Sequence, residues 1–173
     1  KKNTLNTIMS CFFICGLASV MWVAFGYSIS FSGDVGGIIG DLKNIFFNGV
    51  SLQSGENGAI PPALFGIFQM MFAIITPALI CGSLAERMKF SKLVIFIALW
   101  SILVYYPLAH MVWSADGLIA KLGALDFAGG NVVHISSGVA GLVACIVLGK
   151  RKGYGALNYK PHNVPFVVLG AAL

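Results

Sequence analysis

The sequence predicts an all-α protein that crosses a membrane several times, and composition and segment length carry that prediction. The 173 residues are 58% hydrophobic and only 10% charged, and their mean hydropathy is +0.88. A soluble domain carries about 25% charged residues, so most of this chain is suited to lipid. Four apolar segments are each about 20 residues long, which is enough to cross about 30 Å of hydrocarbon as a helix. These spans, and a fifth that is cut by the end of the sequence, run over about 5–29, 61–84, 93–113, 129–149 and from 164.

Local signals mark where several of these spans begin and end. Lys1 and Lys2 precede the first span. The second span starts at Pro61 and Pro62, because proline is favoured in the first turn of a helix. The third span closes at Trp113, a residue type that is enriched at membrane–water interfaces.

Basic residues alternate between rich and poor loops and thereby predict the orientation. Their numbers before the first span and after each of the four complete spans are 2, 1, 3, 1 and 4. Loops rich in Lys and Arg stay in the cytoplasm, which places loops 85–92 and 150–162 there. The Gly-rich loop 30–60 is then external, and its portion 35–47 has the composition of a short interfacial helix.

Asp126 and His134 place ionisable groups at the entrance of the fourth span and inside it. Such groups cost roughly 2.5 kcal/mol or more at bilayer depth, so they indicate function by default, here the movement of an ion or proton. Asp126 either holds a cation or caps the helix that follows Gly129, and the two roles are compatible. His134 lies eight residues further on, about 12 Å deeper along a helix. A buried neutral imidazole either relays protons or hydrogen-bonds a neighbouring helix.

Aromatic residues lie above this histidine on the expected path from outside. Phe68 and Phe72 are four residues apart and share one helical face. Together with Trp113 they form a candidate cation site, since an aromatic face attracts a small cation by about 0.5–2 kcal/mol. The alternatives are an interfacial role for the tryptophan and lipid or core packing for the two phenylalanines.

Small residues surround His134 and predict close helix packing. A stripe of small residues lets membrane helices approach one another. The stripe is formed by residues spaced four apart, namely Ser137, Gly141, Cys145 and Gly149, and Gly130 and Gly138 lie beside it. His110, three residues before Trp113, is interpreted as structural or interfacial.

Other chemistries find little support in the sequence. Cys11 and Cys15 share a helical face, as packing residues or as a metal or redox pair. No nucleophile–base pair, phosphate-binding loop, metal-ligand spacing or basic–aromatic run occurs, so we expect no enzyme, no cofactor, no metal and no nucleic acid. A haem between His110 and His134 is disfavoured because their expected depths differ.

The stretch Asp126–Arg151 (DFAGGNVVHISSGVAGLVACIVLGKR) resembles the signature of the ammonium transporter family, Amt/Mep/Rh, and is closest to its bacterial-type Amt branch. Four further stretches carry the same resemblance, so that it covers the whole chain. They are WVAFGYS at 22–28, Phe68 to Phe72, the turn at 85–87, and HMVW at 110–113.

The resemblance implies a role for each of these residues. Trp113 and Phe72, with the Ala128 carbonyl nearby and Asp126 in support, match an external ammonium-recruitment site. Phe68 and Phe72 match a stacked phenylalanine gate. His134 matches the first of two pore histidines, past which ammonia and its proton cross separately.

The resemblance also implies an architecture and partners. The family fold is a homotrimer of subunits with two inverted five-helix halves, eleven spans in bacterial members, in a plasma membrane and with a cytoplasmic PII-type regulator. The chain is then a fragment that lacks the first span and most of the second half, including the second pore histidine. An ammonium sensor on the same fold and an Rh-type gas channel remain alternatives.

Overall fold

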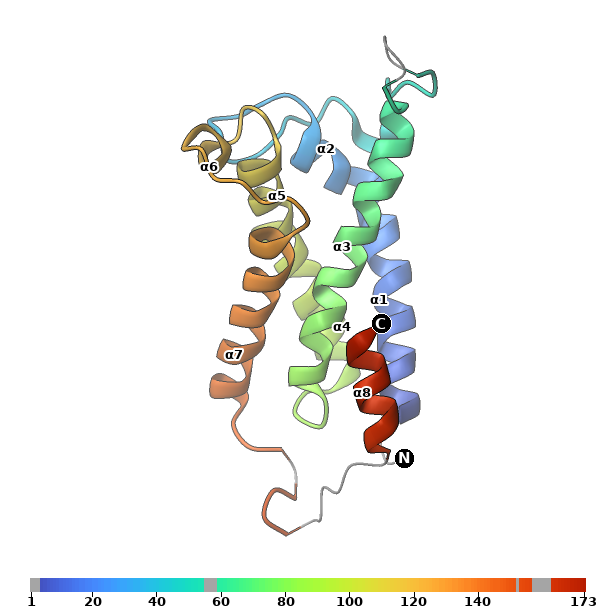
Figure 1. Ribbon diagram of the computed structural model, residues 1–173, viewed down its shortest axis with the longest axis vertical. Helices are drawn as coiled ribbons and strands as arrows, with labels where there is room; N and C mark the ends of the chain where they lie inside the picture. Colours follow the sequence, from blue (N-terminus) through green and yellow to red (C-terminus); the bar gives the residue numbers. More distant parts are fainter. Residues whose placement is uncertain (1–3, 55–58, 152, 157–162) are drawn as a thin grey trace.

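The computed structural model describes residues 4–54, 59–151, 153–156 and 163–173, and within them it is a bundle of long helices (Figure 1). Lys1, Lys2, Lys152, Lys160 and His162 lie outside the described residues. Four helical rods have the length and apolar composition to cross a membrane, and each lies over one of the four apolar segments. Their bounds are Thr4–Phe31, Pro62–Leu84, Phe90–Lys121 and Gly130–Leu148.

The first rod consists of α1 (Thr4–Met21), the π turn η1 (Trp22–Gly26) and α2 (Tyr27–Phe31). Its central anchor is Trp22, which is fully buried and donates its indole N–H to the Gly66 carbonyl at 2.9 Å. Gly26 lies under the Tyr106 ring, because a Cβ there would be 2.7 Å from Tyr106 Cζ. A larger residue at position 26 would therefore push the first and third rods apart.

The second rod, α3 (Pro62–Leu84), packs between α1 and α7 (Ser136–Leu148). It starts with Pro62 in its first turn, where a missing N–H costs no hydrogen bond. At its far end two arginines bind main-chain carbonyls. Arg87 donates to Ser83 O at 2.7 Å and to Gly149 O at 2.9 Å, which ties the ends of α3 and α7 together. Arg151 adds a bond to Gly82 O at 3.3 Å.

The third rod is α4 (Phe90–Trp100), the π turn η4 (Ser101–Tyr105) and α5 (Tyr106–Trp113), with the short α6 (Leu118–Lys121) after a corner. The π turn ends two residues before Pro107, whose missing N–H breaks the α-helical bonding pattern. Tyr105 and Tyr106 are both buried in the centre of the bundle.

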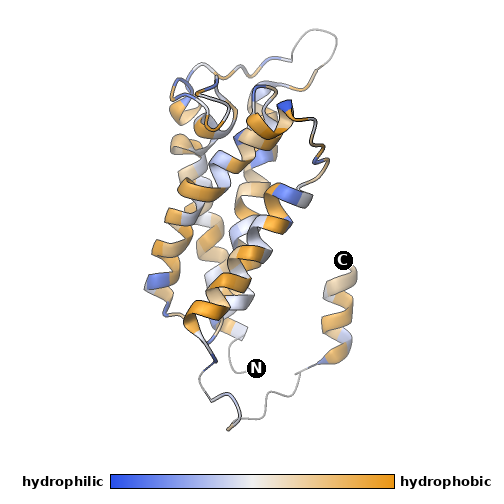
Figure 2. Cartoon of the chain, turned by 90° about the vertical axis from the view of Figure 1, so that its left-hand side faces the viewer, coloured by the Kyte–Doolittle hydropathy of each residue, from blue (hydrophilic) through white to orange (hydrophobic). Residues whose placement is uncertain are grey.

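The fourth rod begins with the π turn η5 (Gly130–Ile135) and continues as α7. An apolar cleft of about 590 Å³ separates it from the third rod and is lined by residues such as Trp100 and Val139. The last helix, α8 (Val164–Ala172), stands away from the bundle (Figure 2). Many large apolar side chains of the rods are exposed, as Leu103 (70% exposed) and Ile146 (71% exposed) illustrate. Such a surface suits lipid, because a soluble protein keeps contiguous apolar patches small.

The loop after α2 does not form the interfacial helix expected over 35–47. Val35 and Ile39 instead close a tight turn through a β-bridge, and only the 3₁₀ turn η2 (Ile45–Phe47) is helical. Gly36 and Gly37 adopt φ of +68° and +74°, which a right-handed helix does not allow. The two glycines therefore form a turn in a segment whose apolar residues had suggested a helix.

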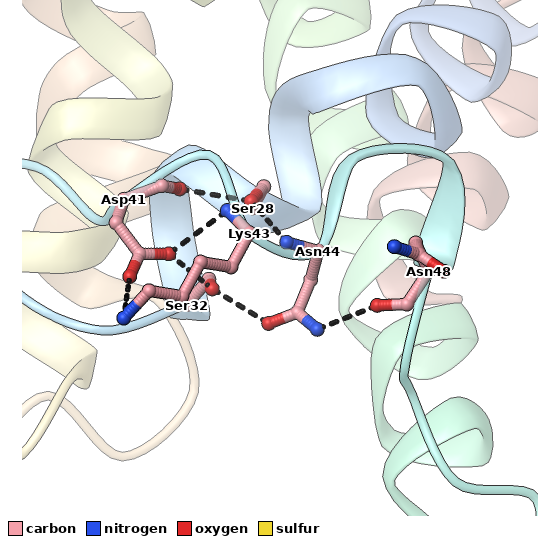
Figure 3. Close-up of polar contacts among 6 residues, drawn as sticks. All are labelled: Ser28, Ser32, Asp41, Lys43, Asn44 and Asn48. Carbon is pink, nitrogen blue, oxygen red and sulfur yellow. Dashed lines mark hydrogen bonds and ion pairs between the residues drawn. The ribbon is translucent and has the colours of Figure 1, made fainter.

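Polar side chains fold the rest of this loop (Figure 3). Ser32 Oγ lies 2.6 Å from both Asp41 Oδ1 and Asn44 Oδ1, and Ser28 Oγ donates to the Asp41 carbonyl at 2.8 Å. Lys43 forms an ion pair with Asp41 at 3.1 Å. The hydrogen bond from Ser32, together with the Lys43 amide and ammonium, lowers the pKa of Asp41 to about 2.

Candidate substrate-recruitment site

Three aromatic rings from α3 and α5 form the candidate site. The Phe68 and Phe72 ring centroids are 5.3 Å apart at an interplanar angle of 88°. Phe72 also meets Trp113, with centroids 5.5 Å apart and 60° between the planes. Both contacts are edge-to-face. Phe68 and Phe72 therefore do not stack face to face in the way that the resemblance suggested. The edge-to-face arrangement is favourable because the positive edge of one ring meets the negative face of the other. Phe68 is 54% exposed, whereas Phe72 and Trp113 are half-buried.

Trp113 is fixed by the loop that precedes η5. Its indole N–H donates to the main-chain carbonyl of Asp126 at 3.0 Å. Gly129 follows with φ of +97°, and a Cβ there would lie 2.6 Å from Val133 Cγ2. Glycine is therefore required at 129 for the chain to turn into η5 beside the indole ring. Ala128, in the same loop, is exposed.

The carboxylate of Asp126 caps η5 with four hydrogen bonds. Oδ1 accepts the N–H groups of Gly129 at 2.7 Å and Gly130 at 2.8 Å. Oδ2 accepts those of Asn131 at 2.8 Å and Val132 at 2.9 Å. Partial burial acts to raise the pKa of Asp126, but these four N–H bonds outweigh it and the pKa lies below its ordinary value.

This capping geometry bears on both roles considered for Asp126. A carboxylate has about four lone-pair sites, and four main-chain donors already occupy them. The cap is therefore its structural role, and its negative charge acts on the neighbouring loop at a distance. The double-glycine sequence after Asp126 was the signal for this cap.

His134 lies in η5, eight residues after Asp126. Its main-chain N–H bonds to the Gly129 carbonyl at 2.9 Å, one residue further back than in an α-helix. Its side chain is exposed in this chain, as is Gly138 one turn later. The structure therefore brings Trp113, Phe72 and the Asp126 loop into contact, and it leaves His134 on an open helix face.

The small residues divide between packed and open positions. Ser137 is buried, and a Cβ on Gly141 would lie 2.7 Å from Ser83 Oγ of α3. Cys145 extends this contact, with Sγ 3.5 Å from Ser83 O. Gly138 and Gly130 are exposed and make no close interhelical approach among the described residues. The four cysteines, Cys11, Cys15, Cys81 and Cys145, are all free thiols.

Two polar groups near the site were not identified from sequence as site residues. His110 is fully buried and lies within hydrogen-bond distance of Ser30 O and Asp34 Oδ1. Gln69, beside Phe68, has a buried Oε1 without a hydrogen-bond partner among the described residues. No local motif marks the first arrangement, because its members are 76 and 80 residues apart in sequence.

A family model described as the Ammonium Transporter Family matches residues 1–173, the whole chain. The chain belongs to the ammonium transporter family. It is 51% identical over 173 residues to an ammonium transporter of Bacillus subtilis, covering 99% of this chain and 42% of that protein. It is 44% identical to the ammonium transporter Amt1 of Archaeoglobus fulgidus, covering 100% of this chain and 42% of that protein. Members of this family are transporters rather than enzymes.

Solved structures of ammonium transporter family members share the fold. Mep2 of Saccharomyces cerevisiae superimposes with a TM-score of 0.83 at 38% identity, over 96% of this chain and 39% of that one. A structure titled "Sensor Amt Protein" gives a TM-score of 0.84 at 29% identity, over 98% of this chain and 44% of that one. The chain thus spans less than half the length of these relatives.

Proposed function

We propose that this chain belongs to a transmembrane ammonium transporter and supplies its outer recruitment site and the first part of its conduction path. The observation that carries the proposal is the fixed contact of Trp113 with both Phe72 and the Asp126 carbonyl. An indole held in this way presents an aromatic surface to a cation without further ordering. Preorganised groups bind more tightly because less conformational freedom is lost.

Recruitment would combine three weak attractions. The aromatic faces of Trp113 and Phe72 attract ammonium, by about 0.5–2 kcal/mol as water is removed. The exposed main chain at Ala128 offers a carbonyl acceptor for an ammonium N–H. The charge of Asp126, held ionised by its four amide donors, adds a longer-range attraction without direct contact.

A gate and a relay would follow along the path. Phe68 and Phe72 form an apolar constriction that a hydrated metal ion crosses poorly, because its water shell has no replacement there. Below them the imidazole of His134 accepts a proton on one ring nitrogen and donates from the other. The exposed face that carries His134 would be enclosed by the remaining part of the full-length transporter.

The surroundings of the transporter follow from the same proposal. Loops 85–92 and 150–162 face the cytoplasm of a plasma membrane, and subunits assemble as a homotrimer. A PII-type regulator would bind on that cytoplasmic side. Gly141 and the buried Ser137 let α7 pack closely, while the exposed Gly130 and Gly138 add no side chain to the face beside His134.

The test is the ammonium-evoked current of the full-length protein in proteoliposomes on a solid-supported membrane. A saturating inward positive current is expected. His134→Ala should alter the current and the selectivity over potassium, whereas Gly16→Ala, at an open position of α1, should not. Unchanged flux and selectivity in folded His134→Ala protein would remove the relay role from this residue.

A sensor is the second candidate function, favoured by the structural match to a sensor Amt protein. A sensor would bind ammonium at the same aromatic site and give no sustained current. An Rh-type gas channel would pass ammonia without current and would be insensitive to Trp113→Leu. Parallel measurements of ammonium binding, ammonia flux and current in the same protein separate the three.

A further inference from the structure

His110 is a buried histidine whose two ring nitrogens both face hydrogen-bond acceptors. Nδ1 lies 3.1 Å from the Ser30 carbonyl of α2, and Nε2 lies 3.0 Å from Asp34 Oδ1 of the following loop. The His110 side chain is 0% exposed and that of Asp34 is 27% exposed. A main-chain carbonyl accepts only, so Nδ1 must carry a proton to make its bond.

The second contact then requires a further proton. An ionised carboxylate also accepts only, and Asp34 Oδ1 already accepts the Gly37 N–H at 2.8 Å. The hydrogen bonds from His110 and from the Gly37 amide lower the pKa of Asp34 below its ordinary value, although burial acts in the opposite direction. The carboxyl group of Asp34 therefore carries no proton. Both bonds are satisfied together only by a doubly protonated, positively charged imidazole.

The other charged groups around the pair are compatible with an imidazolium. Lys121 of α6 acts on Asp34 and is itself paired with Asp116 at 3.5 Å. Asp41 in the same loop is paired with Lys43. The carboxylate of Asp126, before η5, accepts main-chain amides. The hydroxyl of Tyr106, in α5 itself, is buried and has no hydrogen-bond partner among the described residues. Asp34 is therefore the counter-ion of His110.

The pair ties the outer loop to the helix end that carries Trp113. The His110 carbonyl accepts the Ser114 N–H at 3.1 Å, which closes the last turn of α5 around Trp113. Gly37, bonded to Asp34, accepts the Leu118 N–H through its carbonyl at 2.8 Å. The loop therefore clamps the corner between α5 and α6 on both sides of the tryptophan.

We propose that His110 and Asp34 form a buried imidazolium–carboxylate pair that positions Trp113 and that releases the outer loop when the imidazole loses a proton. This role rests on the proposed recruitment function of Trp113. Loss of one ring proton would break one of the two bonds. The outer site would then bind ammonium more weakly although no group that touches the cation has titrated.

Imidazole protonation is measured first, by nitrogen NMR of the full-length protein labelled at histidine, with His110→Gln identifying the signal. Two protonated ring nitrogens near neutral pH, falling to one in Asp34→Asn, are expected. A single protonated nitrogen in the unmodified protein would overturn the proposal. This readout does not depend on transport, so it stands even if the protein proves to be a sensor.

Ammonium-evoked current provides the second measurement, at fixed ammonium-ion concentrations across a pH series. Asp34→Asn should raise the half-saturating ammonium concentration about fivefold or more, with little change in maximal current, and should flatten its rise toward alkaline pH. Gly16→Ala, at an open position of α1 that does not touch the pair, is the control. Equal half-saturation and equal pH profiles for folded Asp34→Asn and the unmodified protein would refute the positioning role. Absence of current in the unmodified protein would instead refute the transport function and leave the NMR result to decide the pair.

Discussion

Trp113 and Asp126 are joined through the aspartate main chain, because the indole N–H donates to the Asp126 carbonyl at 3.0 Å, while the Asp126 carboxylate accepts four main-chain amides. One residue thus anchors the tryptophan with its carbonyl and caps η5 with its carboxylate. The start of the fourth rod and the orientation of the aromatic site are consequently set by the same five-residue turn. Substitutions in this turn are expected to change stability and ammonium affinity together.

Trp113→Phe keeps an aromatic ring but removes the N–H that fixes it. We expect weaker ammonium binding because the ring is free to leave Phe72, and Trp113→Leu should weaken binding further by removing the aromatic face. A neutral hydrogen bond is worth about 1 kcal/mol, or roughly a fivefold change in half-saturation. Current against ammonium concentration tests this, with Trp100→Phe at the end of α4 as control. Identical curves for Trp113→Phe and the unmodified protein would show that the bond does not matter.

Asp126→Ala leaves four N–H groups at the start of η5 without their acceptor. We expect a loss of about 1–2 kcal/mol or more in the free energy of unfolding, at or above the range of a lost N-cap. Thermal unfolding of the full-length protein in detergent measures it, and Asp116→Ala controls for loss of a charge. An unfolding midpoint equal to that of the control would contradict the capping role.

The low pKa of Asp41 predicts that the stability of the outer loop falls in acid. Its pKa is about 2 in the folded protein, below the unfolded value of about 3.9, so it contributes stability that is present above about pH 4. That contribution is lost as pH falls toward 2. Asp41→Asn should therefore lower the unfolding midpoint at about pH 5 more than at about pH 3. A difference that stays constant between these pH values would mean that the carboxylate is not held ionised by Ser32 and Lys43.

Gly141→Ala tests the contact between α7 and α3. A Cβ at this position would lie 2.7 Å from Ser83 Oγ, so the helices must separate or the serine must turn. Overpacking of this kind costs typically about 1–3 kcal/mol. Gly16→Ala is the matched control, because its Cβ meets nothing within 4 Å and alanine favours a helix. A midpoint for Gly141→Ala as high as that for Gly16→Ala would exclude close packing at this point.

Hydropathy and length were sufficient to predict the helical rods, because a chain in lipid must satisfy its main-chain groups internally. The cap at Asp126 was also readable, since an acid before two glycines is a local signal. The helix predicted over 35–47 was wrong, because the prediction followed the apolar residues of this loop and gave too little weight to Gly36 and Gly37. Glycine conformations and polar side-chain bonds decided that segment instead.

Only part of the candidate site could be predicted, because spacing along one helix can be read from the sequence but the way in which two helices cross cannot. The shared face of Phe68 and Phe72 follows from their spacing, whereas the edge-to-face contact with Trp113 depends on how α3 and α5 cross. His110 was interpreted as structural or interfacial, and its partner Asp34 was not identified, because the two residues meet only once the first and third rods are packed together. The assigned functions of these residues, His134 included, stay predictions.

Three of the four rods contain a π turn, at Trp22–Gly26, Ser101–Tyr105 and Gly130–Ile135. A π turn is an α-helix with one extra residue, and successive residues of an α-helix are about 100° apart around its axis. Deleting one residue from Ser101–Tyr105 would therefore restore ordinary pitch and rotate the remainder of that rod by about 100°. Trp113 would turn away from Phe72 although every side chain of the site was still encoded. The number of residues in these stretches therefore sets the orientation of the site as much as their identity does.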